Sequence, residues 1–411
     1  MKLEKYTLEN GLRLIFQKDE STTIAVVNTL YNVGSKDEDP EHTGFAHLFE
    51  HLMFGGSKNI DDFDGALQIS GGENNAFTSN DITNYYISIP VQNIETAFWL
   101  ESDRMLELDF SQRNLDIQRN VVIEEFKERY LNQPYGDVWI YLRKMAYENH
   151  PYSWPTIGKE ISHIEKASLQ EVRDFFYRYY APDNAILVVI GNLEGEFVYS
   201  MVNKWFGNIE KRNVIRNPMP VLQEQLKQNR LRIEKDVPYH ALYIVFKMCK
   251  KSDPDFYATD LLSDILSNGR SSRFYQNHLS KGELFSELDA YLSGELQEGL
   301  FVITATLLDG KTIESAEKAI MDELNHLINN GVSKQELRKV MNKLESTKVF
   351  SEINTTSRAY MIAMHELTGD ANDINFEIEK YRQVKPEDIL RVARKIFRPE
   401  NSSVLEYLSK R

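Results

Sequence analysis

The hydrophobic positions along the chain predict alternating helices and strands. Apolar residues recur at helical spacing in residues 311–330 and 333–350, and they alternate with polar residues in 75–89 and 239–248. The first pattern gives a helix one apolar face, and the second does the same for a strand. The hairpin-like strand runs favour antiparallel sheets. We therefore predict an α+β protein in which helices pack on mostly antiparallel sheets.

A weak internal repeat relates the two halves of the chain, with an offset of roughly 215 residues. In residues 168–189 and 385–406, a helical stretch is followed by Pro, an acidic residue and Asn, and then by an apolar run. Proline cannot continue a helix and Asn tolerates turn geometry, so both segments predict a helix, a turn and a strand. Residues 44–57 and 257–271 also correspond in apolar spacing and in the glycine that follows.

The segment between the repeats has the composition of a linker. Residues 211–230 are polar, contain two prolines and show no clear periodicity. We predict two homologous domains, residues 1–210 and residues 231–411, each with its own sheet and covering helices. A chain of 411 residues is long enough for two or three domains.

Composition narrows the classes of partner. The net charge of −14 disfavours nucleic acid and anionic membranes, because an acidic surface repels phosphate groups. No run of about 18 apolar residues occurs, and the N-terminal MKLEKYTLENGLRLIF lacks the apolar core of a signal peptide. We expect a cytoplasmic protein, or a periplasmic one if an export signal was trimmed. The single cysteine, Cys249, excludes an internal disulfide and a four-cysteine zinc site.

The candidate chemistry begins with His47, Glu50 and His51. Histidines four residues apart project from the same face of a helix, where both can bind one metal ion. Glu50 flanks that face and can reach a water molecule there. The order H-x-x-E-H is the inverted zinc-peptidase motif. Its spacing alone does not decide between a metal site and two histidines on an ordinary amphipathic helix.

A catalytic zinc also needs a third protein ligand. The helical segment 118–129, QRNVVIEEFKER, offers Glu124, Glu125 and Glu128. These residues are equally consistent with a solvated acidic face. Spacing does not choose among the three glutamates.

Four motifs in order resemble the pitrilysin/insulinase family of zinc peptidases, and within it the bacterial proteins similar to the mitochondrial processing peptidase β subunit. They are GFAHLFEHLMFGGSKN, GGENNAFTSNDITNYY, RNVVIEEFKER and HPYSWPTIG, and they span residues 44–158. The resemblance implies that His47, His51 and Glu125 bind one Zn²⁺ per chain and that Glu50 is the general base. It further implies hydrolysis of short or unfolded peptides. The peptide would pair with the strand that contains Asn75, Ala76, Phe77 and Thr78.

The sequence departs from the family pattern at two places. Gln118 stands where the family usually has a second glutamate, seven residues before Glu125, so it would support the site without adding charge. An Arg/Tyr pair that holds the substrate backbone is expected near His278 or Leu279 and near Phe285, and neither residue type is present. We therefore predict a paralogous partner subunit that contains this pair, and otherwise a homodimer.

Two other functions remain open. Some members of the family keep the fold as non-catalytic scaffold or assembly subunits, and a zinc-dependent binding module would also need the motif. The intact set His47, Glu50, His51 and Glu125 favours a peptidase.

Overall fold

The computed structural model describes residues 1–216 and 218–410, so residue 217 of the predicted linker and residue 411 of the predicted second domain lie outside it. The strands are Glu4–Thr7 (β1), Arg13–Lys18 (β2), Ile24–Tyr31 (β3), Glu73–Thr78 (β4), Thr83–Pro90 (β5), Ala185–Gly191 (β6), Asn229–Lys235 (β7), Ala241–Lys247 (β8), Phe285–Leu292 (β9), Leu300–Leu307 (β10) and Ser402–Ser409 (β11). The α-helices are Phe45–Leu52 (α1), Phe63–Ile69 (α2), Ile94–Leu106 (α3), Gln112–Phe126 (α4), Val138–Tyr147 (α5), Ile161–Glu165 (α6), Leu169–Tyr179 (α7), Gly195–Phe206 (α8), Asp255–Ser267 (α9), Arg273–Asn277 (α10), Ile313–Asn330 (α11), Lys334–Ile353 (α12), Thr355–Thr368 (α13), Glu377–Arg382 (α14) and Pro386–Ile396 (α15).

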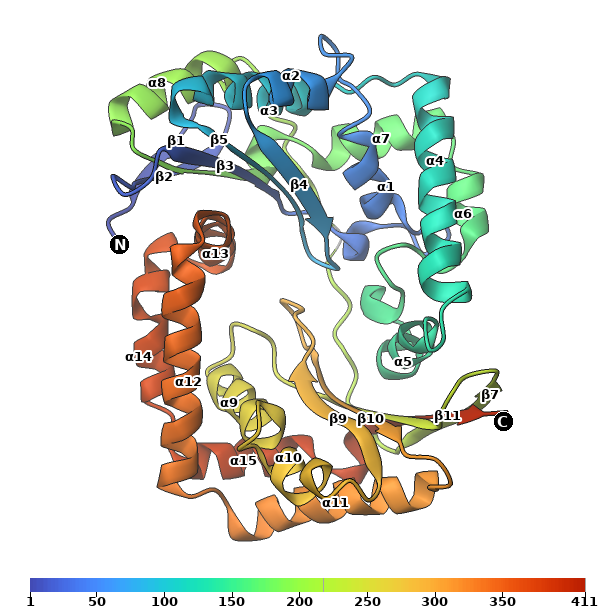
Figure 1. The fold of residues 1–411 in the computed structure, drawn as a ribbon. Helices are drawn as coiled ribbons and strands as arrows, with labels where there is room; N and C mark the ends of the chain where they lie inside the picture. The colour runs from blue at the N-terminus through green and yellow to red at the C-terminus, as the bar shows by residue number, and fades with distance from the viewer. Residues whose placement is uncertain (217, 411) are drawn as a thin grey trace. The chain divides into compact units, whose positions relative to one another are not determined.

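The strands of the described residues form two sheets, in the orders β1-β2-β6-β3-β5-β4 and β7-β11-β8-β10-β9. Most neighbours are antiparallel, while β2 runs parallel to β6 and β7 runs parallel to β11. Helices pack on both sheets (Figure 1). The predicted α+β class with mostly antiparallel sheets is confirmed. No helix within residues 1–216 and 218–410 combines the length and the apolar character that a membrane span requires.

The repeat predicted from the Pro-acidic-Asn motif corresponds to a shared structure. In each half of the chain, a helix (α7 or α15) ends just before the motif. The strand that follows the motif (β6 or β11) lies between one parallel and one antiparallel neighbour. The asparagine side chain of the motif links the end of the helix to the end of a neighbouring strand. Asn184 Nδ2 donates to the carbonyl oxygens of Tyr179 and Asn32, and Asn401 Nδ2 donates to those of Ile396 and Lys247. In each half the amide bonds the carbonyl of the last residue of the helix, Tyr179 or Ile396. Its second bond goes to a carbonyl at the end of the neighbouring strand (Lys247) or just beyond it (Asn32).

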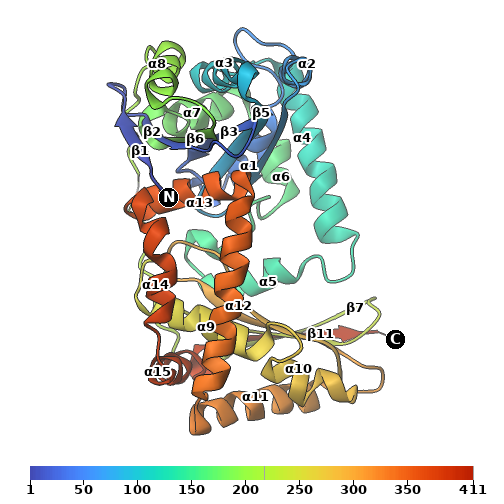
Figure 2. The ribbon, with the colours of Figure 1, turned by 60° about the vertical axis from the view of Figure 1, so that its left-hand side comes forward.

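Contacts divide the chain into two compact units that are not continuous in sequence. The first unit contains Met1–Glu128, Trp154–Met219 and Val349–Phe376, and the second contains the remaining segments. Helix α13 therefore belongs to the first unit, where it packs on β3 and β6, as the views in Figures 1 and 2 show. The predicted domains, residues 1–210 and 231–411, were defined by the sequence repeat, whereas these two units are defined by contacts in the structure.

The second half has acidic residues at the places of the two histidines. Asp260 and Asp264 lie on α9, and burial raises the pKa of Asp260 to about 6. The Tyr381 hydroxyl donates a hydrogen bond to Asp260 at 2.6 Å, which opposes the rise, as does the charge of Lys251. Asp264 and Glu377 add to the rise by like-charge repulsion.

We expect Asp260→Asn to change how stability depends on pH. The folded-state pKa lies above the usual value of 3.8, so the native protein binds an extra proton between about pH 4 and pH 6, and its free energy of unfolding falls as pH rises through that window. Asparagine accepts the same Tyr381 hydrogen bond and does not ionise. The variant should match the wild type at pH 4 and exceed it by about 1–3 kcal/mol at pH 7 in urea denaturation. An equal difference at both pH values would contradict this.

Candidate metal centre

Helix α1 presents His47 and His51 on one side because its other side is apolar. Phe45, Leu48, Phe49 and Leu52 are buried, and the two histidines lie four residues apart between them. Helix α4 packs against α1. It begins at the N-cap Ser111, whose hydroxyl accepts the Asn114 N–H, and it buries Val122 and Phe126. This packing brings Glu125 opposite the histidines.

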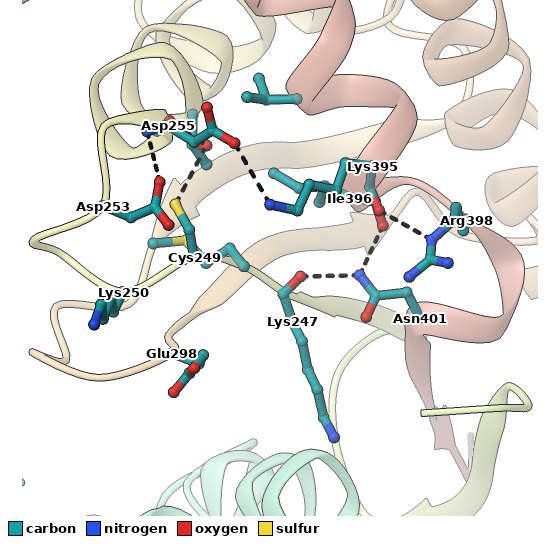
Figure 3. A pocket seen from close by; sticks show the side chains of 13 residues that line it. Lys247, Cys249, Lys250, Asp253, Asp255, Glu298, Lys395, Ile396, Arg398 and Asn401 are labelled. Carbon is teal, nitrogen blue, oxygen red and sulfur yellow. Dashed lines mark hydrogen bonds and ion pairs between the residues drawn. The ribbon is translucent and has the colours of Figure 1, made fainter. Parts of the chain in front are cut away.

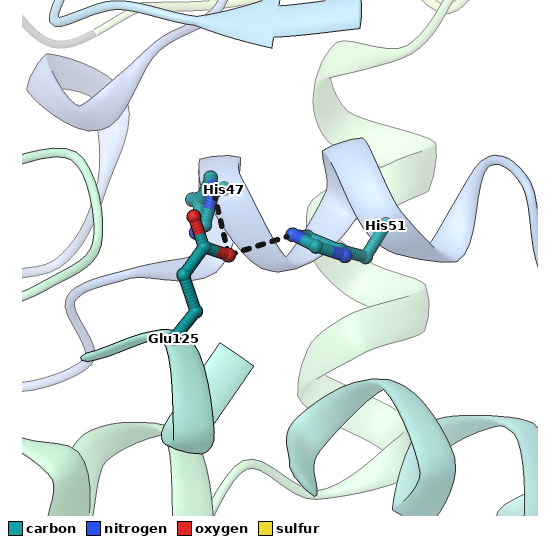
Figure 4. Close-up of side chains that lie close together, drawn as sticks. All are labelled: His47, His51 and Glu125. Atoms are coloured by element: carbon teal, nitrogen blue, oxygen red, sulfur yellow. Dashed lines mark ion pairs between the residues drawn. The ribbon is translucent and has the colours of Figure 1, made fainter. Parts of the chain in front are cut away.

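The structure brings three of the predicted site residues together. Glu125 Oε2 lies 3.6 Å from His47 Nε2 and 3.3 Å from His51 Nε2. Figure 4 shows that the two imidazole rings and the carboxylate point toward one another. Within residues 1–216 and 218–410, no other group of three or more His, Cys, Asp or Glu side chains has ligand atoms arranged for one metal ion.

The arrangement fits zinc. Bonds of about 2.1 Å at tetrahedral angles set the donor atoms of a zinc site about 3.4 Å apart. The two separations from Glu125 Oε2 lie on either side of that value, and all three ligand atoms are within 4.8 Å of one another. Two imidazole nitrogens and one carboxylate oxygen are also a donor set that catalytic zinc sites use, with a fourth position left for water.

Glu50 is held beside this cluster by strand β4. The Thr78 hydroxyl donates a hydrogen bond to Glu50 Oε2 at 2.7 Å. Cross-strand pairing puts Thr78 and Ala76 opposite Thr83 and Tyr85, on the side of the sheet that faces α1. The sequence identified Thr78 only as a residue of the substrate strand, and its contact with Glu50 was not predicted.

The four residues predicted to bind substrate lie on an edge strand. Strand β4 pairs with β5 and is the last strand of its sheet among the described residues. Phe77 and Asn75 face the opposite side from Thr78, and the Phe77 ring packs against Tyr360 of α13, with the ring centroids 5.1 Å apart.

Gln118 lies on α4, partly buried and two turns before Glu125.

Sequence reasoning missed the residues that fix the start of α1. Glu38 is 6% exposed and accepts the backbone N–H groups of Gly44 and Ala46 and the indole N–H of Trp154, each at 2.9 Å. Burial raises the pKa of Glu38 to about 8, against these three hydrogen bonds, which favour the charged form. The sequence feature that could have pointed to an outside capping residue is Gly44 at the start of the helix. A helix that begins after glycine has no side-chain N-cap of its own.

Two family models match the chain. "Insulinase (Peptidase family M16)" matches residues 13–160, and "Peptidase M16 inactive domain" matches residues 166–344. The chain belongs to peptidase family M16. The zinc protease PqqE of Helicobacter pylori is 28% identical over 98% of this chain and 92% of its own length. A crystal structure of a protease from Helicobacter pylori superposes with a TM-score of 0.94 at 27% identity, covering 99% of both chains. The probable mitochondrial-processing peptidase subunit beta of Arabidopsis thaliana is 22% identical over 88% of this chain and 70% of its own length.

The family predicted from the four motifs is thus confirmed, and this M16 protein has relatives named as zinc proteases. The description of the second model as an inactive domain agrees with the residues of α9. There Asp260, Ser263 and Asp264 stand where the first half has the H-x-x-E-H histidines and glutamate.

A pocket in the second unit has no comparable chemistry. It has a volume of about 260 Å³, and its wall includes Cys249 and several charged side chains (Figure 3). Lys395 Nζ lies 3.5 Å from Asp255 Oδ2, so opposite charges in the wall offset each other. Burial raises the pKa of the Cys249 thiol to about 11, which keeps it protonated and a poor nucleophile. The thiol in this wall is therefore not activated as a nucleophile.

Proposed function

We propose that this M16 protein is a zinc-dependent endopeptidase that hydrolyses short or unfolded peptides. The observation that supports this most directly is the convergence of His47, His51 and Glu125 on one point. Glu50 lies on α1, the helix that contains the two histidines. Scaffold proteins have no need to keep donors at zinc-binding separation. Relatives named as zinc proteases support the same function.

The roles of the side chains follow from their chemistry. His47, His51 and Glu125 would hold one zinc ion. When bound, zinc supplies a Lewis acid for the peptide carbonyl and lowers the pKa of water. Glu50 takes a proton from the attacking water and delivers it to the leaving amine. The hydrogen bond from the Thr78 hydroxyl fixes the orientation of the Glu50 carboxylate for that transfer.

Strand β4 supports a binding mode for the substrate. An edge strand offers backbone N–H and C=O groups to an extended peptide, which then becomes an additional strand. Backbone pairing of this kind makes little demand on the substrate sequence. It does require an extended chain, which is why we propose short or unfolded peptides as substrates, bound along Asn75–Thr78.

We further propose a paralogous partner that contributes an Arg/Tyr pair. The positions where this chain would contain the pair are occupied by core residues. Phe285 is 2% exposed in the core of the second unit, Leu279 packs against that core, and the His278 ring lies 5.8 Å from the Phe285 ring. Burial also lowers the pKa of His278, so it is a poor replacement for an arginine.

Zinc content and hydrolysis of an unfolded peptide test these proposals together. The purified chain should bind one zinc ion and hydrolyse the peptide slowly. Addition of a paralogue with the Arg/Tyr pair should raise kcat/KM at least tenfold, and a chelator should abolish the activity. Full turnover by the chain alone would refute the partner. Zinc without hydrolysis under either condition would indicate a binding module, and neither zinc nor hydrolysis would indicate a scaffold.

A further inference from the structure

The N-terminus of α1 is capped from outside the helix. Gly44 is the N-cap residue, has φ +92° and lacks a side chain, so it cannot satisfy the first N–H groups of the helix. Glu38, six residues earlier, supplies the missing acceptors. Its Oε2 accepts the Gly44 N–H and its Oε1 accepts the Ala46 N–H, each at 2.9 Å. The buried carboxyl group of Glu38 thus caps the helix that contains the H-x-x-E-H motif by accepting these two N–H groups.

Trp154 also holds the Glu38 carboxyl group. Its indole N–H donates to Glu38 Oε2 at 2.9 Å, and its own side chain is buried. The segment after Trp154 lies tightly against the start of α1. A Cβ added to Gly44 would come within 2.6 Å of the Ile157 carbonyl oxygen and 2.7 Å of Ile164 Cδ1. The helix start is therefore fixed by hydrogen bonds and by close packing at once.

The position of this helix start bears on the metal centre because α1 is short. It spans eight residues, and His47 is its third. A small tilt of so short a helix moves His47 and His51 relative to Glu125, which lies on the separate helix α4. Zinc tolerates donor distances only within about 0.2 Å of its preferred values. The 3.6 Å and 3.3 Å separations at Glu125 therefore depend on how α1 is anchored.

We propose that Glu38 and Trp154 are positioning residues for the zinc-binding helix, joined in a hydrogen-bonded unit that sets the direction of α1 before metal binds. This inference rests on the proposed zinc site and adds two residues outside its motif. Glu38 accepts the backbone N–H groups of Gly44 and Ala46, and Trp154 donates to Glu38. Each acts through the backbone of α1.

The test replaces each residue with a variant of nearly the same shape. Trp154→Phe removes the indole N–H and keeps an aromatic ring. Glu38→Gln keeps the length but has one oxygen for three donors, and its NH₂ group must face at least one of them. The chain offers a matched control: Trp205 Nε1 donates to Glu95 Oε1 at 3.2 Å on the surface of the same unit. Trp205→Phe and Glu95→Gln therefore remove the same kind of contact away from α1.

Three measurements are made on the full chain: zinc affinity by chelator competition, the absorption spectrum of the Co²⁺-substituted protein, and amide hydrogen exchange of α1 in the metal-free protein. Trp154→Phe should weaken zinc binding about tenfold and Glu38→Gln by 10- to 100-fold, as for other residues that orient metal ligands. Both should shift the Co²⁺ spectrum and speed exchange at α1, while the two control variants match the wild type.

Two results would overturn the inference, and they are distinguishable. If the wild type binds zinc and hydrolyses peptide while Trp154→Phe matches it in affinity, spectrum and exchange, the positioning role is wrong and the proposed function stands. If the wild type binds neither zinc nor Co²⁺, the proposed function and the inference both fail. If Glu38→Gln does not fold, Trp154→Phe decides the question alone, because phenylalanine retains most of the buried ring.

Discussion

Glu50→Gln is expected to reduce peptide hydrolysis by about a thousandfold or more while the protein keeps its zinc. General acid–base catalysis contributes about 10²- to 10⁴-fold, and an amide cannot take up a proton at neutral pH. The amide oxygen of glutamine can still accept the hydrogen bond that Thr78 donates to Glu50, so α1 and β4 stay joined. The measurement is kcat for an unfolded peptide, together with zinc content by elemental analysis.

Glu124→Gln is the matched control for this change. Glu124 is the glutamate next to Glu125, but its side chain is 73% exposed and pairs with Lys127. We expect it to keep both zinc and activity. A Glu50→Gln protein that retains a tenth of the wild-type kcat would contradict the role of Glu50 as the general base.

His51→Ala and Glu125→Gln are expected to lose zinc binding by at least a hundredfold. Each removes one of three donors that lie within 4.8 Å of one another, and two donors hold zinc poorly against a chelator. The loss of zinc binding should appear as a lower zinc content after dialysis. It should also appear in thermal unfolding, because a ligand that binds only the folded state raises the Tm by mass action.

The Tm comparison separates this loss from unfolding. Wild type, Glu50→Gln and Glu124→Gln should all gain Tm when zinc is added, whereas His51→Ala and Glu125→Gln should not. The metal-free variants should stay folded, because the buried faces of α1 and α4 are apolar and do not depend on metal. If Glu124→Gln loses zinc and Glu125→Gln keeps it, the assignment of the third ligand is wrong.

The sequence predicted the parts of the site that depend on local periodicity. Helical spacing placed His47 and His51 on one face, and α1 has that geometry. The third ligand could not be found in this way, since Glu124, Glu125 and Glu128 all lie close together in sequence. The family resemblance selected Glu125, and the packing of α4 on α1 sets it apart in the structure. The Glu125 side chain is 15% exposed and faces the histidines, and the Glu124 side chain is 73% exposed.

The contacts that local patterns could not predict join residues far apart in sequence. Thr78 reaches Glu50 across 28 residues, and Trp154 reaches Glu38 across 116. Tyr360 packs on Phe77 although the repeat assigns the two residues to different halves. Such contacts depend on how finished elements pack, and apolar periodicity carries no information about which elements become neighbours.

The placement of α13 in the first unit has a consequence for synthesis of the protein. The helix buries Ala359, Ile362 and Ala363, packs on β3 and β6, and its Arg358 pairs with Asp19. On the ribosome, these residues emerge after nearly nine-tenths of the chain. Domains usually fold as they emerge, N-terminal first. Here most of the sheet that supports the metal centre leaves the ribosome before α13, so the packing of α13 on β3 and β6 is among the last steps that complete the first unit.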